Sequence, residues 1–251
     1  MQKVGLKAAN LLRRKWPVAL CAAVLLQKEG TSKTNLLHLD HIVILCNGAF
    51  PTEPYPLYLL DSADGVVCCD GALEKLLSYK PEMRPIAVVG DMDSLLEGLQ
   101  ERFSRVLVHY EEQDYNDMTK ALRWVLEKHP EAVDITFLGA TGLRADHTIG
   151  NMGLLMEYTR LFELGERRLS AVDDYGTAFA ITDSCELHLG EGRRFSLFSA
   201  DNTLRITSEG LEWPTDDVVF DAWWKATLNR TSAPIVRLHF SHPSAALVMI
   251  D

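Results

Sequence analysis

Short apolar runs alternate with helical patterns up to about residue 180. The runs that indicate buried strands lie at 42–46, 66–69, 86–89, 106–108 and 135–138. Between them, apolar residues recur at helical spacing, as at Met118, Ala121, Leu122 and Val125. This alternation predicts an α/β domain with a parallel sheet, in which ligands bind at the carboxyl ends of the strands.

The pattern changes near residue 180, where the apolar runs become short and the helical spacing ends. Strand-like runs lie at 186–189, 195–198, 203–207, 235–240 and 246–250. A small antiparallel β-sandwich fits this pattern. We therefore expect an α/β nucleotide-binding domain at 41–180 and a β-sandwich domain at 181–251. No linker rich in Gly or Pro separates them, so we expect the two domains to pack closely.

Residues 1–40 precede the first predicted strand. Arg13-Arg14-Lys15 followed by the apolar stretch 16–26 superficially resembles a signal peptide. The stretch is short for a membrane span, and Gln27-Lys28-Glu29 takes the place of a small-residue cleavage site. We expect either a loosely attached helical extension or upstream sequence included by a mistaken start site, and no membrane association.

The composition is that of an ordinary globular protein. The 251 residues are 47% hydrophobic and 24% charged. A formal net charge of −10 argues against a general nucleic-acid-binding surface. The 5 cysteines form no Cys-x-x-Cys pair, which favours reduced core thiols and a cytoplasmic location.

Asp91 and Asp93 directly follow the apolar run at 86–89 and Gly90. Residues two apart in an extended segment project to the same side, so both carboxylates can converge on one point. A bridging cation would relieve their repulsion, and Mg²⁺ prefers such hard oxygen ligands, usually together with substrate phosphates. Ordinary turn chemistry is the alternative interpretation.

A second polar cluster, Gln113-Asp114-Tyr115-Asn116-Asp117, opens a predicted helix. Its residues 114–116 include candidates for the N-cap. Asp117 and Lys120 are three residues apart and therefore neighbours on that helix. The alternative to a functional cluster is a capped helix with an ordinary surface ion pair.

A third cluster follows the run at 135–138. Glycines between a strand and a helix let backbone N–H groups approach phosphate, although the segment 139–147 is not a Walker A loop. Arg144 has the planar fork that clamps a phosphoryl group. Asp146 and His147 would either cap the following helix or hold Arg144 in place.

Taken in order, four segments resemble the thiamine pyrophosphokinase family: Cys69-Asp70-Gly71-Ala72, 90–94, 113–122, and 139–147 followed by Asn151. The resemblance runs from about Ile42 to the C-terminus. It implies a two-domain homodimer that transfers the pyrophosphoryl group of ATP to the hydroxyl of thiamine, giving thiamine diphosphate and AMP. The sequence departs from the family pattern at Asp70-Gly71-Ala72, where Asp-Gly-Gly-Ala is usual, and at Leu143, where Gly is usual.

The resemblance also implies roles for individual residues. The Mg²⁺ ligands would be Asp91, Asp93 and Asp117. The catalytic residues would be these three with Asp114, Lys120 and Arg144. ATP would be bound by Asp70, Gln113, Asn116, Arg144, Asp146 and His147. Thiamine would be bound in the β domain by Trp213, Thr227 and Asn229.

Two other functions fit the same motifs. A related pyrophosphokinase would act on another heterocyclic alcohol, such as a pterin, and would differ in the β domain. A non-catalytic thiamine or nucleotide sensor would keep the fold, but the intact Asp91, Asp93, Asp117 and Arg144 speak against it. Trp213 also has a simpler interpretation, as a packing or dimer-contact residue.

Overall fold

The computed structural model describes residues 39–251. The predicted helical extension at 1–40 therefore lies almost wholly outside the described residues. Within residues 39–251, no helix combines the length and the apolar character needed to cross a membrane. The chain forms two compact units, which we call the α/β unit and the β unit. The β unit comprises Thr159–Leu161 and Gly176–Asp251.

The α/β unit contains six parallel strands in the order β6-β5-β1-β2-β3-β4. The strands are β1 (His41–Leu45), β2 (Gly65–Cys69), β3 (Ala87–Gly90), β4 (Leu107–His109), β5 (Asp134–Leu138) and β6 (Arg168–Val172). The helices are α2 (Pro54–Ser62), α3 (Ala72–Tyr79), α4 (Glu97–Phe103), α5 (Asp117–Lys128) and α6 (Ala145–Leu161), and the last three residues of α6 are counted with the β unit. The parallel sheet and its first five strands confirm the prediction, whereas β6 was missed.

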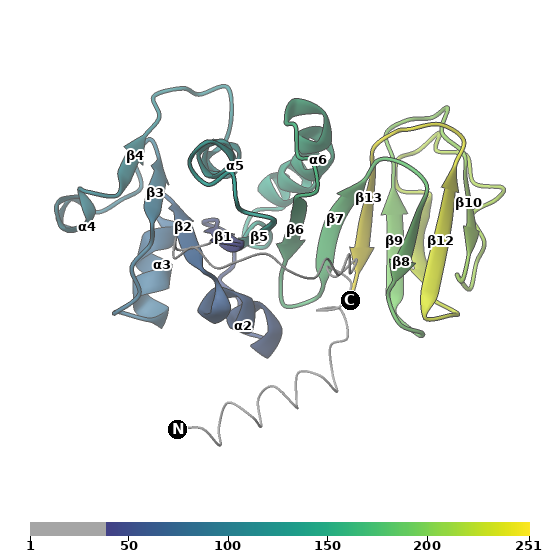
Figure 1. Ribbon diagram of the computed structural model, residues 1–251, viewed down its shortest axis with the longest axis horizontal. Coiled ribbons are helices and arrows are strands. Elements are labelled where there is room, and N and C mark those ends of the chain that lie inside the picture. Colours follow the sequence, from purple (N-terminus) through teal and green to yellow (C-terminus); the bar gives the residue numbers. More distant parts are fainter. Residues whose placement is uncertain (1–38) are drawn as a thin grey trace, which may run out of the picture. The chain divides into compact units, whose positions relative to one another are not determined.

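The strand order reverses beside β1, because β2 to β4 extend from one side of it and β5 and β6 from the other. Crossovers between parallel strands are right-handed, so this reversal places α5 and α6 on the opposite face of the sheet from α2 and α3. Figure 1 shows this division of the helices. The carboxyl ends of β1 and β5 form the switch point at which such sheets bind ligands.

The core of the α/β unit forms where the predicted apolar runs lie. The β1 residues Ile42–Leu45 are fully buried, as expected for a strand covered on both faces. The apolar stripe of α5, which includes Met118, Leu122 and Val125, is buried and packs on β2 and β3. This packing fixes the start of α5 near the carboxyl ends of those strands.

The β unit contains two antiparallel sheets, in the orders β11-β9-β13-β7 and β10-β12-β8. Its strands are β7 (Thr177–Ile181), β8 (Cys185–His188), β9 (Arg194–Phe198), β10 (Ile206–Glu209), β11 (Ala226–Arg230), β12 (Ile235–Phe240) and β13 (Ala246–Ile250). Both sheets contribute to one apolar core, for example Leu197 and Leu238. The predicted β-sandwich is confirmed. β7 and β11 were missed, and the strand predicted at 203–207 begins later.

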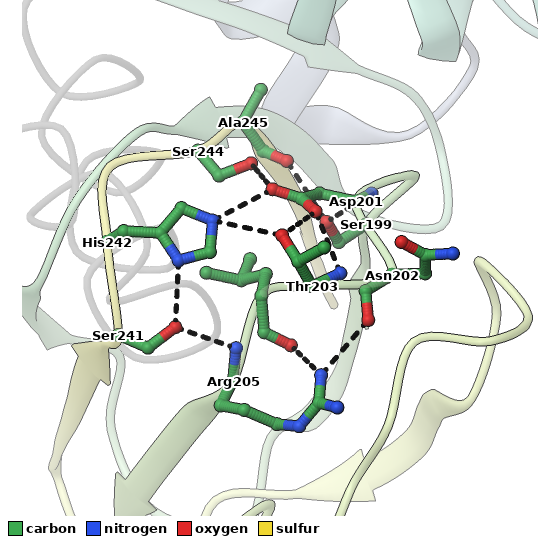
Figure 2. Close-up of polar contacts among 10 residues, drawn as sticks. Ser199, Asp201, Asn202, Thr203, Arg205, Ser241, His242, Ser244 and Ala245 are labelled. Carbon is green, nitrogen blue, oxygen red and sulfur yellow. Dashed lines mark hydrogen bonds and ion pairs between the residues drawn. The ribbon is translucent and has the colours of Figure 1, made fainter.

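One carboxylate ties two loops of the β unit together. Asp201, which follows β9, accepts hydrogen bonds from Thr203 and from Ser244, and it lies 3.0 Å from Nε2 of His242. Figure 2 shows His242 between Asp201 and Ser241. These contacts join the loop after β9 to the loop between β12 and β13.

Candidate active site

Two loops lie against each other at the switch point of the α/β sheet. The backbone N–H of Gly48, after β1, donates to the carbonyl of Gly139, after β5, at 2.8 Å. The N–H of Ala49 donates to the carbonyl of Thr141 at 2.8 Å. A Cβ at Gly48 would lie 2.3 Å from the Gly139 oxygen, and Gly139 has a φ of +64°. Glycine is therefore required at both positions for this close approach.

Three carboxylates meet at the carboxyl ends of β2 and β3. Oxygens of Asp70, Asp91 and Asp93 all lie within 4.8 Å of one another. Asp91 and Asp93 converge as the sequence predicts. Asp70 was assigned only to nucleotide binding, but the structure places it in the same cluster.

The loop after β3 holds these carboxylates through short polar contacts. The N–H of Ser94 donates to Asp70 Oδ2 at 3.1 Å, and the Ser94 hydroxyl donates to Asp93 Oδ1 at 2.8 Å. The N–H of Asp93 donates to Asp91 Oδ1 at 3.3 Å. A Cβ at Gly90 would lie 2.9 Å from Cβ of Asp70. Gly90 thus leaves the space that Asp70 occupies.

Asp117 and Lys120 lie beside this cluster on the first turn of α5. A Cβ at Gly90 would also lie 3.5 Å from Asp117 Oδ1, which places Asp117 next to Asp70. The Lys120 ammonium lies 3.4 Å from Asp117 Oδ1, and only 2% of the Lys120 side chain is exposed. The ion pair is therefore mostly buried and not the ordinary surface pair of the alternative interpretation.

The carboxylates perturb one another. Burial raises the pKa of Asp70, and the charges of Asp117, Asp91 and Asp93 raise it further against the hydrogen bond from Ser94. Burial likewise raises the pKa of Asp117, with Lys120 opposing. The backbone hydrogen bond from Asp93 lowers the pKa of Asp91. The four carboxylates therefore concentrate more negative charge at this site than the ammonium group of Lys120 can neutralise.

The cluster fits a divalent cation. Asp70 Oδ1 is buried and has no hydrogen-bond partner among residues 39–251. Such an orphaned carboxylate oxygen is costly unless a ligand satisfies it. Hard carboxylate oxygens on a rigid strand edge are the ligands that Mg²⁺ prefers. Asp70, Asp91 and Asp93 are therefore suited to hold it, with Asp117 adjacent.

The predicted residues ahead of α5 have different surroundings. The amide of Gln113 lies 3.4 Å from Asp91 Oδ2. Asn116 is the N-cap of α5, and its side-chain oxygen accepts from the N–H of Thr119 at 3.1 Å. The predicted cap is therefore confirmed. Asp114 is exposed to solvent.

Arg144 stands at the start of α6 with its guanidinium held by Asp146. Nε and Nη2 of Arg144 lie 3.1 Å and 2.5 Å from the two Asp146 oxygens. The hydrogen bond from Arg144 is the main cause that lowers the pKa of Asp146 to about 2. The N–H of His147 also donates to Asp146. Of its two predicted roles, Asp146 therefore has the role of holding Arg144. The N-cap residue of α6 is Arg144, and its side chain makes no capping hydrogen bond.

Leu143 occupies a strained position in the same loop. Its φ is +56°, in the left-handed region that favours glycine, and 78% of the residue is exposed. The departure from the family pattern therefore costs backbone energy, and the added side chain points to solvent.

Two further aspartates at this edge were missed because β6 was missed. Asp173 accepts a hydrogen bond from the hydroxyl of Thr141 at 2.8 Å. Asp174 accepts from Thr52 and from the N–H of Glu53, at the start of α2. The signal was Asp-Asp directly after a short strand, but Arg168–Val172 is too polar to stand out as an apolar run.

The three residues predicted to bind thiamine lie in the β unit. Trp213 is 55% exposed and Asn229 is buried. The Asn229 amide binds the backbone of Trp213, donating to its carbonyl at 2.6 Å and accepting from its N–H at 3.2 Å. Thr227 lies in β11, where the register shifts. The neighbouring Leu228 has a φ of +60° and is 87% exposed, a strained feature that the sequence did not reveal.

Comparison with known proteins points to one family. The model of the thiamin pyrophosphokinase catalytic domain matches residues 57–163, and that of the thiamin pyrophosphokinase substrate-binding domain matches residues 176–246. Thiamine pyrophosphokinase 1 of Oryza sativa subsp. japonica is 25% identical over 204 residues, which cover 70% of this chain and 74% of the relative. Thiamine pyrophosphokinase of Bacillus subtilis is 40% identical over 75 residues, which cover 28% of this chain and 34% of the relative.

Solved structures share the fold. The crystal structure of yeast thiamin pyrophosphokinase aligns with a TM-score of 0.69 at 15% identity, covering 86% of this chain and 89% of that one. The Bacillus subtilis enzyme aligns with a TM-score of 0.66 at 20% identity, covering 84% and 98%. With both family domains matched in order, the chain belongs to the thiamine pyrophosphokinase family.

Proposed function

We propose that this protein transfers the pyrophosphoryl group of ATP to the hydroxyl of thiamine, giving thiamine diphosphate and AMP. The observation that carries the proposal is the carboxylate cluster of Asp70, Asp91 and Asp93 at the carboxyl edge of the sheet. Membership of the thiamine pyrophosphokinase family supports the choice of substrates.

The carboxylates would bind the cation that accompanies ATP. Asp70, Asp91 and Asp93 supply the converging oxygens, and Asp117 lies adjacent. A bound Mg²⁺ would neutralise the phosphate charge and orient the triphosphate. Asp70 and Asp117 have raised pKa values because they are buried among like charges, and cation binding relieves that repulsion.

Arg144 and Lys120 would stabilise the charge of the transferred group. Arg144 is exposed on the loop after β5, and its guanidinium is oriented by Asp146. Lys120 is buried and fixed beside Asp117. Positioning and electrostatics carry most of phosphoryl-transfer catalysis, so a dedicated base is not required. Asp114 is the candidate to test for that role, and Gln113, Asn116 and His147 remain predicted nucleotide contacts.

Thiamine would be recognised by the β unit. Trp213 presents an exposed indole that suits stacking on a heteroaromatic ring, and Asn229 holds its backbone. Thr227 stays a predicted contact. The homodimer also stays a proposal, supported by Trp213, Trp223 and Trp224, which are all about half exposed. The cytoplasmic location is also a proposal, supported by the lack of a Cys-x-x-Cys pair in the sequence and by the free thiols of Cys46, Cys68, Cys69 and Cys185 among residues 39–251.

The proposal is tested by incubating the purified protein with ATP, Mg²⁺ and either thiamine or a hydroxymethylpterin. The expected result is AMP and thiamine diphosphate with thiamine only. AMP formed only with the pterin would assign a related pyrophosphokinase. Tight binding of thiamine or ATP without any product would assign a sensor. Either of these outcomes would overturn the proposal.

A further inference from the structure

A chain of hydrogen bonds runs from α6 through the start of α5 to the loop after β5. The Asn116 amide nitrogen donates to Asn151 Oδ1 at 2.8 Å. The Asn151 amide nitrogen donates to the carbonyl of Ala140 at 2.7 Å. Asn116 accepts from both the N–H and the hydroxyl of Thr119. All these residues belong to the α/β unit.

The polarity of this chain is fixed at both ends. The N–H of Thr119 can only donate and the carbonyl of Ala140 can only accept, so both amides have one allowed orientation. The Thr119 hydroxyl donates to Asn116 and lies 2.7 Å from the hydroxyl of Tyr158, which therefore donates to it. Bonds aligned in this way polarise one another and strengthen the chain.

Asn116 is exposed, but the other members of this chain are buried, which makes its hydrogen bonds at Asn151 and Thr119 costly to break. Thr119 and Tyr158 are fully buried, and Asn151 is 9% exposed. Ala140, whose carbonyl ends the chain, is 4% exposed. Loss of the Asn151 amide would leave that carbonyl without this donor inside the protein, so the loop would have to shift to find another.

Two members of the chain, Asn116 and Ala140, adjoin the two halves of the candidate site. Asn116 directly precedes Asp117, which lies beside the carboxylate cluster with Lys120. Ala140 lies in the loop that leads from Gly139 to Arg144. Asn151 stands on α6 between them and is itself too deeply placed to serve as an exposed ligand.

We propose that Asn151 is a positioning residue that fixes the start of α5, with Asp117 and Lys120, relative to the loop after β5, with Arg144. Asn116 is its partner, and the two amides act as one unit. The proposal rests on the proposed function, because it assigns both halves to one reaction. A displacement of about 1 Å between such groups is enough to cost on the order of a hundredfold in rate.

The test compares Asn151→Ala, Asn116→Ser and the double variant with the wild-type enzyme. Serine keeps the N-cap of α5 but loses the bond to Asn151. Thr136→Val is the matched control, because it removes the partly buried hydrogen bond to His41, at the first residue of β1 and away from the loops. The measurements are kcat, KM for ATP and thiamine, the Kd of Mn²⁺ as a probe of the metal site, and urea unfolding.

Each single variant should lower kcat at least about tenfold and weaken Mn²⁺ binding at least about threefold, and the double variant should do no worse than the poorer single variant. Thr136→Val should change stability only. Additive losses, or effects no larger than those of Thr136→Val, would overturn the proposal. A wild-type protein that makes no thiamine diphosphate would refute the proposed function instead, and the Mn²⁺ affinities would still decide the role of Asn151.

Discussion

The side-chain amide of Asn229 makes hydrogen bonds to both the carbonyl and the N–H of the Trp213 backbone. Its nitrogen donates to the Trp213 carbonyl at 2.6 Å, and its oxygen accepts from the Trp213 N–H at 3.2 Å. The same oxygen also accepts from the N–H of Arg230 at 2.8 Å. The exposed indole of Trp213 is thereby set on a backbone that Asn229 holds, so in the proposed thiamine site Asn229 would act through Trp213.

Asn229→Ala should raise the KM for thiamine about tenfold and leave the Kd of a non-hydrolysable ATP analogue unchanged. The reason is that two backbone groups of Trp213 lose their partner, which costs roughly 1–3 kcal/mol. Ser199→Ala is the control, because it removes another buried polar side chain of the β unit. If nucleotide affinity falls while the KM for thiamine holds, the division of roles between the units is wrong.

Asp70→Asn should stabilise the metal-free protein and lower turnover at least about a hundredfold. Burial among Asp117, Asp91 and Asp93 raises the pKa of Asp70, so its charged form disfavours the folded state and a neutral amide removes that penalty. Thermal unfolding with and without Mg²⁺ measures both effects. The stabilisation by Mg²⁺ that we expect in the wild type should largely disappear in the variant.

Asp61→Asn serves as the comparison, because Asp61 makes a surface ion pair with Lys80. That variant should change stability little and keep turnover. A metal-free Asp70→Asn protein that unfolds more easily than the wild type would contradict the electrostatic account of Asp70.

The β unit should lose stability in acid through Asp201. Hydrogen bonds from Thr203, followed by the contact with His242, hold the pKa of Asp201 well below its usual range. A carboxyl with a lowered folded pKa stabilises the protein above its unfolded pKa, near 4, and that stabilisation is lost as the pH falls through the folded pKa. Urea unfolding of wild type and Asp201→Asn should differ at neutral pH, and the difference should shrink as the pH falls from about 4 towards the folded pKa. A difference that stays constant across this range would refute the assignment.

Leu143→Gly should leave stability unchanged or raise it slightly, although a glycine normally costs about 1 kcal/mol. The backbone of Leu143 is already in the left-handed region, so glycine removes a penalty of roughly 1–2 kcal/mol. Ile149 is also exposed but lies inside α6, where a glycine costs about 1 kcal/mol, and Ile149→Gly should therefore be destabilising. Equal losses in both variants, measured by urea unfolding, would show that the strain at Leu143 is not released.

The sequence predicted those parts of the fold that rest on apolar periodicity. The buried runs of β1, β2, β3 and β5 were recognised because parallel strands are apolar on both faces. β6 was not predicted because Arg168–Val172 mixes polar and apolar residues. Asp173 and Asp174, which directly follow this strand, were therefore not predicted as site residues either. β11 was missed because the register shift at Leu228 interrupts its alternation.

The sequence predicted which aspartates belong to the candidate site, but not that Asp70 lies in the same cluster as Asp91 and Asp93. Asp91 and Asp93 share a strand end, so their convergence followed from local geometry. The place of Asp70 beside them depends on the pairing of β2 with β3 and on the absence of a side chain at Gly90, which no local pattern contains. The link from Asn116 to Asn151 depends in the same way on the packing of α5 and α6.

The most direct measurement is ³¹P NMR of ATP, thiamine and Mg²⁺ with wild-type protein and with Asp93→Asn. Asp93 is exposed at the strand edge, so the variant should stay folded while losing one of the converging carboxylates. The wild type should form AMP and thiamine diphosphate in equal amounts, and Asp93→Asn should form almost none at saturating Mg²⁺. ADP as the nucleotide product, or near-normal turnover by Asp93→Asn, would contradict pyrophosphoryl transfer at this carboxylate cluster.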